Sequence, residues 1–213
     1  MLCVLDYGSQ YTQLIARRLR SQGFFTEVLP GNLSAAEVAQ HKPNGIILSG
    51  SPHSVGTGHD PDPALLSLGV PILGLCFGYQ YLAQLLGGRV EPGTHREYGA
   101  ATVRKTPAGK SDPLVHRLSP TTSVWMSHGD SVVALPPGTE LILESAGKPA
   151  GFALPSRRVW GLQFHPEVYH TPEGKLLLEA FARDICRLTP DWNLRAELSE
   201  IKDKQRDLAA EAD

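Results

Sequence analysis

A strand-to-helix transition around one cysteine constrains the fold of this 213-residue chain more than any other feature. The apolar run Pro71–Leu75 has the pattern of a buried strand, and the helical pattern YQYLAQLL begins four residues after Leu75. Cys76 lies on the turn between them, where the flanking Gly74 and Gly78 allow close backbone approach. Such a turn presents its central side chain beside the N-terminal amides of the next helix. A lone cysteine is more often a buried structural residue, so this prediction of a nucleophile elbow depends on finding a base.

Strand and helix patterns alternate through the first half of the chain, which predicts a single α/β domain. A βαβ order of this kind favours a central, mostly parallel mixed sheet with helices on both faces. From Arg89 to Phe164 the pattern changes to short strands and turns, which predict antiparallel additions to the same sheet. The expected strands are Leu2–Leu5, Phe24–Leu29, Gly45–Leu48 and Pro71–Leu75, and the expected helices are Gln10–Ser21, Ala35–His41, Ala64–Leu68 and Glu173–Arg187.

A histidine able to act as the base follows another strand pattern far downstream. The segment Arg158–Phe164 reads as a strand, so His165 would emerge at an edge of the sheet, where loops carry chemistry. Beyond Pro166, the Glu167 carboxylate can turn back to hold one imidazole nitrogen while the other faces a thiol. His165 and Glu167 alone would be an ordinary surface pair, but together with the elbow they predict a catalytic triad with Cys76.

The two signatures GLCFGYQ and GLQFHPEV resemble those of class I, or triad-type, glutamine amidotransferases. Four further motifs resemble the amidotransferase domain of GMP synthetases, more than its relatives in anthranilate, carbamoyl phosphate or CTP synthesis. These are VLDYGSQYTQLIARR from Val4, REYG from Arg96, VWMSHGD from Val124 and HPEVYHT from His165. The resemblance extends from Leu2 to about Trp192 and implies a flavodoxin-like α/β fold.

The resemblance also implies a role for individual residues. Cys76 would attack the side-chain amide of glutamine to form a glutamyl thioester and release ammonia, His165 would transfer the protons, and Glu167 would orient the imidazole. The oxyanion hole would consist of the backbone amides of Ser51 and Phe77. Ser51 replaces the second glycine of the usual Ser-Gly-Gly-Pro loop, which preserves the N–H donor provided the local backbone does not require glycine. The residues expected to bind the substrate are Gly50, Gln80, Ser127, His128 and Gly129.

A partner is implied as well. In the family, the half after the position of Trp192 is an ATP-pyrophosphatase synthetase that binds XMP and carries a Ser-Gly-Gly-x-Asp-Ser loop, which is absent from this sequence. ATP and Mg²⁺ are therefore expected only in that partner, and neither a cofactor nor a metal in this chain. Residues 1–192 would form the amidotransferase domain. Residues 193–213, rich in charge with a thin apolar stripe, would form a helical tail or linker toward the synthetase half.

Composition sets the remaining expectations. The net charge of -2 gives no reason to expect nucleic-acid or membrane binding, and the apolar runs are too short to cross a bilayer. Three cysteines without a signal peptide predict a reducing cytoplasm, with Cys3 and Cys186 as core or helix-face residues. His165, Glu167 and His170 lie close together in the sequence, but they do not form a convincing set of three or four ligands at the usual metal-site spacing, so no metal site is expected.

Several alternatives remain open at this point. The chain could be the glutaminase component of another amidotransferase, a partner-independent γ-glutamyl hydrolase, or a non-catalytic regulatory module of the same fold. Asp6 and Ser9, after the first strand, are read as helix caps more readily than as ligand-binding residues. His128 and Asp130 are read as part of a loop near the substrate and not as a second catalytic pair.

Overall fold

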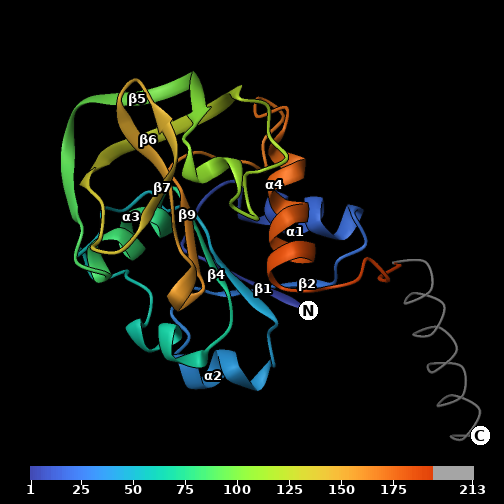
Figure 1. Ribbon diagram of the computed structural model, residues 1–213. Helices are drawn as coiled ribbons and strands as arrows, with labels where there is room; N and C mark the ends of the chain where they lie inside the picture. Colours follow the sequence, from blue (N-terminus) through green and yellow to red (C-terminus); the bar gives the residue numbers. More distant parts are fainter. Residues whose placement is uncertain (194–213) are drawn as a thin grey trace, which may run out of the picture.

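In the computed structural model, nine strands of the described residues form one mixed sheet (Figure 1). The structure describes residues 1–193, without the side chains of residues 94–96. The strand order is β2-β1-β3-β4-β9-β8-β7-β5-β6; the first five strands are parallel, and the others pair antiparallel. The strands are β1 (Leu2–Asp6), β2 (Thr26–Pro30), β3 (Gly45–Leu48), β4 (Ile72–Leu75), β5 (Arg89–Lys105), β6 (Thr121–Ala134), β7 (Glu140–Ser145), β8 (Lys148–Leu154) and β9 (Val159–Leu162).

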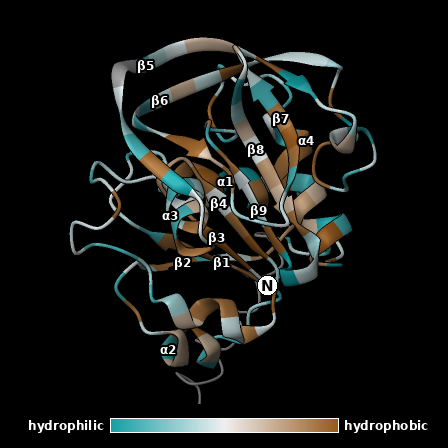
Figure 2. Cartoon of the chain, turned by 60° about the vertical axis from the view of Figure 1, so that its left-hand side comes forward, coloured by the Kyte–Doolittle hydropathy of each residue, from teal (hydrophilic) through white to brown (hydrophobic). Residues whose placement is uncertain are grey.

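Helices cover both faces of the parallel part of the sheet. α1 (Thr12–Ser21) and α4 (Gly174–Ala180) pack on one face, and α2 (Ala35–Gln40) and α3 (Phe77–Leu85) on the other (Figure 1). In β1, Leu2 and Val4 join the first core while Cys3 and Leu5 join the second, as the two-residue period of a strand requires. Figure 2 shows the inner strands as mostly apolar, which fits strands buried on both sides. The predicted α/β architecture is confirmed.

The antiparallel half differs from the sequence prediction in two respects. β5 and β6 are long strands of 17 and 14 residues, and not short ones. The turn-forming residues near Pro92 made β5 look like two short strands in the sequence. In the structure the strand continues past them, with an irregularity between Pro92 and Glu97. β9 is not an antiparallel addition on its β4 side: it pairs parallel with β4 and antiparallel with β8, and all four of its residues are buried.

The helical segments also deviate in detail. The expected helix Ala64–Leu68 is a 3₁₀ helix (Pro63–Leu68), which begins after the capping residue Asp62. The closing helix begins at Gly174 and passes into a π-helical turn (Phe181–Ile185). Two further 3₁₀ turns are Ala108–Lys110 and Pro155–Arg157.

The chain still contacts the domain at Trp192. Its N–H donates to the Gly23 carbonyl at 2.9 Å, and its ring lies 6.2 Å from that of Phe25. The charged helix predicted for residues 193–213 lies outside the described residues, except for Asn193. The predicted domain boundary after Trp192 therefore stays a prediction. Within residues 1–193, no helix has the length and apolar character needed to cross a membrane.

Candidate active site

Cys76 occupies the turn between β4 and α3, and its backbone is strained. Its φ of 52° and ψ of -101° form a conformation that residues with a Cβ rarely adopt, at a cost of about 1–3 kcal/mol. Two backbone hydrogen bonds hold it there: the Cys76 N–H donates to the Leu162 carbonyl at 2.8 Å, and the Cys76 carbonyl accepts from the Gln80 N–H at 3.1 Å. The strand, turn and helix predicted around Cys76 are all present.

Gly74 and Gly78 allow β3, β4 and α3 to approach more closely than any side chain would permit. A Cβ on Gly74 would lie 2.5 Å from the carbonyl group of Gly78, and one on Gly78 would lie 2.5 Å from the carbonyl oxygen of Leu48. Both contacts are with backbone, which cannot rotate away as a side chain can. The two glycines are therefore required by the packing around the turn.

We expect Gly78→Ala to lower the free energy of unfolding by about 2–3 kcal/mol, because the added methyl group must push α3 away from β3. Urea unfolding measures this loss. Gln84→Ala, at an exposed position of the same helix, is the control and should change stability by less than about 0.5 kcal/mol. Equal stabilities of the two variants would contradict the close approach.

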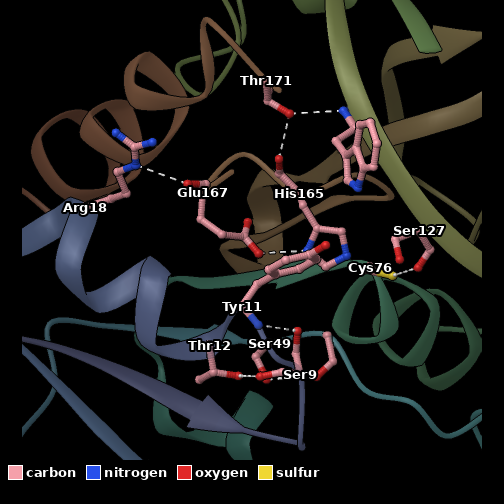
Figure 3. Close-up of polar contacts among 12 residues, drawn as sticks. Ser9, Tyr11, Thr12, Arg18, Ser49, Cys76, Ser127, His165, Glu167 and Thr171 are labelled. Carbon is pink, nitrogen blue, oxygen red and sulfur yellow. Dashed lines mark hydrogen bonds and ion pairs between the residues drawn. The ribbon is translucent and has the colours of Figure 1, made fainter. Parts of the chain in front are cut away.

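His165 and Glu167 follow β9, the parallel neighbour of β4. Because Leu75 pairs with Leu162 in register, both strands end at the same edge of the sheet, and their following residues meet there. The His165 Nδ1 lies 2.7 Å from the Glu167 Oε1, and the two side chains are only 4% and 1% exposed. Figure 3 shows the imidazole between this carboxylate and Cys76. The structure thus brings together the three residues that the sequence predicts as a triad.

The loop that carries His165 is fixed to β6. The His165 N–H donates to the Trp125 carbonyl at 3.1 Å, and the Trp125 N–H donates to the Thr171 hydroxyl at 3.0 Å. That hydroxyl in turn donates to the His165 carbonyl at 2.7 Å (Figure 3). Thr171 therefore closes a ring of three hydrogen bonds around the backbone of the histidine.

The electrostatic surroundings of His165 favour its charged form. Burial by itself lowers the pKa of the imidazole. The negative charge of Glu167, the hydrogen bonds to Cys76 and Glu167, and the thiolate charge of Cys76 outweigh it and raise the pKa of His165 well above its ordinary value. An imidazolium beside the sulfur is the partner that a thiolate nucleophile requires.

Two residues of α1 and its preceding turn support this pair, and sequence reasoning assigned them no role. The Tyr11 ring meets the His165 ring edge-on, with centroids 4.9 Å apart and an interplanar angle of 67°. The Arg18 Nε donates to the Glu167 carbonyl at 3.1 Å (Figure 3). Both residues belong to the N-terminal motif quoted for the family resemblance, which is the signal that could have identified them.

A cavity of about 590 Å³ opens beside Cys76 and His165. Its size suits a small amino acid together with water. The side of β6 and the loop after β3 supply much of its wall. All of the predicted substrate residues and one predicted oxyanion residue line it: Gly50, Ser51, Gln80, Ser127, His128 and Gly129.

The two predicted oxyanion amides belong to Ser51 and Phe77. Within residues 1–193, neither backbone N–H donates to a hydrogen-bond acceptor of the chain. Phe77 is the first residue of α3, where the N–H has no partner within the helix. Ser51 does not have a positive φ, so its backbone does not require the glycine usual at this position. Their role in an oxyanion hole stays a prediction.

Gln80 and His128 line the cavity, and their side chains also contact the backbone that forms its wall. The Gln80 Nε2 donates to the Asp130 carbonyl at 2.7 Å, and the His128 Nδ1 lies 2.8 Å from the same oxygen. Burial lowers the pKa of His128, and Glu97 lies 3.6 Å from its Nε2. Ser127 to Asp130 lie within β6, so the expectation of a loop at this point was wrong. The strand continues because β5 pairs with it on both sides of the irregularity.

The remaining polar residues near the site have structural contacts. The Asp6 Oδ1 accepts from the Gly8 N–H and the Thr12 hydroxyl, and the Ser9 Oγ accepts from the Tyr11 N–H. They stabilise the turn before α1, while the capping position itself is Tyr11. Among the described residues, no three His, Cys, Asp or Glu side chains are grouped to hold a metal ion.

Comparison with known proteins identifies the family. The family model described as "Glutamine amidotransferase class-I" matches residues 3–185, which include both signatures and almost the whole described domain. This chain belongs to the class-I glutamine amidotransferase family. The resemblance predicted from the sequence motifs is confirmed.

Among curated relatives, the proteins named "GMP synthase [glutamine-hydrolyzing]" from Syntrophomonas wolfei and Thermus thermophilus are each 45% identical to this amidotransferase. The matches cover 92% and 98% of this chain but 39% and 41% of those proteins. The amidotransferase thus spans about two-fifths of the length of the curated relatives it matches.

Solved structures give the same fold. A putative GMP synthase subunit from Thermoplasma acidophilum is 29% identical, with a TM-score of 0.72 over 95% of this amidotransferase and 96% of that chain. A glutamine amidotransferase from Thermotoga maritima has a TM-score of 0.66 over 89% of this chain and 86% of its own, at 21% identity.

Proposed function

We propose that this amidotransferase hydrolyses glutamine through a Cys76–His165–Glu167 triad and supplies the ammonia to an ATP-dependent synthetase that converts XMP to GMP. The observation that carries the proposal is the contact of a strained elbow cysteine with a buried histidine–glutamate pair at the wall of one cavity. The proposed pathway rests on the relatives named GMP synthase.

The first half of the reaction forms a thioester. The Cys76 sulfur, as thiolate beside the His165 imidazolium, attacks the side-chain amide carbon of glutamine and gives a tetrahedral oxyanion. The backbone amides of Ser51 and Phe77 donate to that oxygen. His165 then gives its proton to the leaving nitrogen, the C–N bond breaks, and ammonia departs from the glutamyl thioester.

The second half restores the enzyme. Neutral His165 takes a proton from water, whose oxygen attacks the thioester carbon, and collapse of the second oxyanion expels the Cys76 thiolate and releases glutamate. Glu167 keeps the Nδ1 side of the ring occupied throughout, so that the other nitrogen always faces the reacting atoms. No cofactor is needed for these steps, and ATP and Mg²⁺ belong to the synthetase partner.

The length of the relatives supports a synthetase partner. Curated GMP synthases are longer than this amidotransferase, while the Thermoplasma protein carries the name of one synthase component and is matched over nearly all its length. In the proposed reaction, this amidotransferase delivers ammonia to an ATP-pyrophosphatase unit that binds XMP, whether that unit belongs to the same chain or to a second subunit. The proposed role in purine synthesis supports a cytoplasmic location.

We expect glutamate release to be slow from the chain alone and to rise at least about tenfold with a cognate synthetase domain, ATP, Mg²⁺ and XMP, because coupling prevents wasteful hydrolysis. Omission of XMP alone should remove most of the stimulation. Equal and rapid hydrolysis without the partner would favour an independent γ-glutamyl hydrolase. A non-catalytic module would be favoured if glutamine were hydrolysed neither by the chain alone nor in the complete mixture. The control for that result is that the same synthetase makes GMP when free ammonia is supplied.

A further inference from the structure

Gln163 is a buried polar residue that the proposed mechanism does not use. It follows β9 by one residue, is 3% exposed, and its N–H donates to the Ala150 carbonyl of β8 at 3.0 Å. Gln163 is absent from the wall of the large cavity and, together with His128, lines a separate small pocket. Burying a primary amide is costly unless both its ends are hydrogen-bonded.

Both ends of this amide have partners. The Gln163 Oε1 accepts from the Gln80 Nε2 at 3.3 Å, and the Gln163 Nε2 donates to the Cys76 Sγ at 4.0 Å, within the longer reach of sulfur. The Gln163 side chain therefore connects α3 with the nucleophile. It approaches the sulfur from within the protein, whereas glutamine would approach from the cavity.

The orientation of the amide follows from its neighbours. A carbonyl oxygen can only accept, so the contact of Gln80 with the Asp130 carbonyl requires the nitrogen of Gln80 at that end. The second hydrogen of that nitrogen needs an acceptor, which must be the oxygen of Gln163. The nitrogen of Gln163 is thereby directed at Cys76, and a flipped amide would place two donors against each other.

The other neighbour of the sulfur has the opposite effect. The Ser127 carbonyl lies 3.4 Å from the Cys76 Sγ and accepts its S–H, a contact that only the neutral thiol can make. An N–H donor favours the thiolate, and a carbonyl oxygen favours the thiol. The Cys76 sulfur therefore contacts one group that accepts, the Ser127 carbonyl, and one that donates, the Gln163 amide.

We propose that Gln163 is a positioning residue, whose amide N–H holds the Cys76 sulfur as a thiolate in place for attack. The inference rests on the proposed function insofar as it concerns glutamine hydrolysis. Its effect on the sulfur itself is independent of any substrate and can be measured without one.

The test is the pH dependence of Cys76 alkylation by iodoacetamide, followed by mass spectrometry of the Cys76 peptide. Cys3 and Cys186 interfere little, because burial raises the pKa of these thiols to about 11 and about 12. In Gln163→Met, the alkylation midpoint should rise by about 0.5–1 pH unit and the rate at neutral pH should fall about fivefold. Gln84→Met, at an exposed position of α3, is the matched control and should leave the profile unchanged.

Steady-state kinetics separate positioning from substrate binding. We expect kcat for glutamine to fall about tenfold in Gln163→Met, with KM within about twofold of the parent, since Gln163 does not line the cavity. Gln163→Leu also removes the N–H donor and adds no charge, and its midpoint should rise as far. It provides the same test where the methionine variant does not fold.

An unshifted alkylation midpoint in a folded variant would overturn the inference, even if activity fell. A shifted midpoint in a protein whose parent does not hydrolyse glutamine even with a cognate synthetase domain, ATP, Mg²⁺ and XMP would refute the proposed function and leave this inference standing. If the parent hydrolyses glutamine but the alkylation midpoint is unshifted in both variants, this inference is refuted and the proposed function stands.

Discussion

Cys76→Ala should abolish glutamine hydrolysis, with kcat/KM lower by at least about ten-thousand-fold, because the proposed covalent intermediate forms on the Cys76 sulfur. The free energy of unfolding should remain within about 1 kcal/mol of the parent, since the side chain lost is small and lies at the wall of a cavity. Glutamate release and urea unfolding measure the two effects separately.

Two further variants provide controls. Cys3→Ala removes a thiol from the buried face of β1 and should retain hydrolysis. Cys76→Gly should be as inactive as the alanine variant but more stable than it by about 1 kcal/mol, because glycine adopts the positive φ at this turn without strain. Turnover retained by Cys76→Ala would remove Cys76 as the nucleophile, and equal stability of the alanine and glycine variants would argue against backbone strain.

The elbow could be predicted from the sequence because its determinants are local. The apolar run before Cys76, the flanking Gly74 and Gly78, and the helical pattern after them all lie within one short segment. His165 was found in the same way, from a strand pattern followed by His-Pro-Glu. The elbow and the His-Pro-Glu segment together predicted that Cys76 and His165 meet, because a cysteine nucleophile needs a base. The parallel pairing of β4 with β9, which brings them together, was not predicted, since it joins segments nearly ninety residues apart.

The supporting residues could not be placed by such reasoning. Thr171 matters because β6 passes beside it, and Gln163 matters because the Asp130 carbonyl determines the orientation of Gln80. β6 reaches these positions through a long antiparallel pairing with β5, which tolerates an irregularity that resembles a turn in the sequence. Period and turn signals report local preference, whereas these contacts depend on the register between distant strands.

The two oxygens of the Glu167 carboxylate have different surroundings. Its Oε1 contacts the His165 Nδ1 at 2.7 Å, whereas its Oε2 is buried and has no hydrogen-bond partner within residues 1–193. A buried carboxylate with one free oxygen relies on the adjacent positive charge. His165 and Glu167 are therefore expected to act as an ion pair, each stabilising the charge of the other.

Glu167→Gln should lower kcat on the order of a hundredfold or more, because an amide keeps the size of the side chain but removes the charge that stabilises the imidazolium. Loss of that charge also lowers the pKa of His165, which the parent holds well above its ordinary value. The proton donated to ammonia is then lost at lower pH. The alkaline limb of the kcat profile should accordingly move to lower pH in the variant, and Glu91→Gln, an exposed carboxylate on β5, should leave it in place.

The same shift predicts how stability depends on pH. Because the pKa of His165 is higher in the folded than in the unfolded state, its contribution is complete below the unfolded value of about 6.5 and is lost as pH rises through the folded value. The melting temperature of the parent should include this loss on the alkaline side of neutrality, and Glu167→Gln should show less of it. Parallel melting curves against pH for the two proteins, with an unmoved alkaline limb, would show that Glu167 does not hold the proton on His165, and the carboxylate would then be no more than a packing partner of the ring.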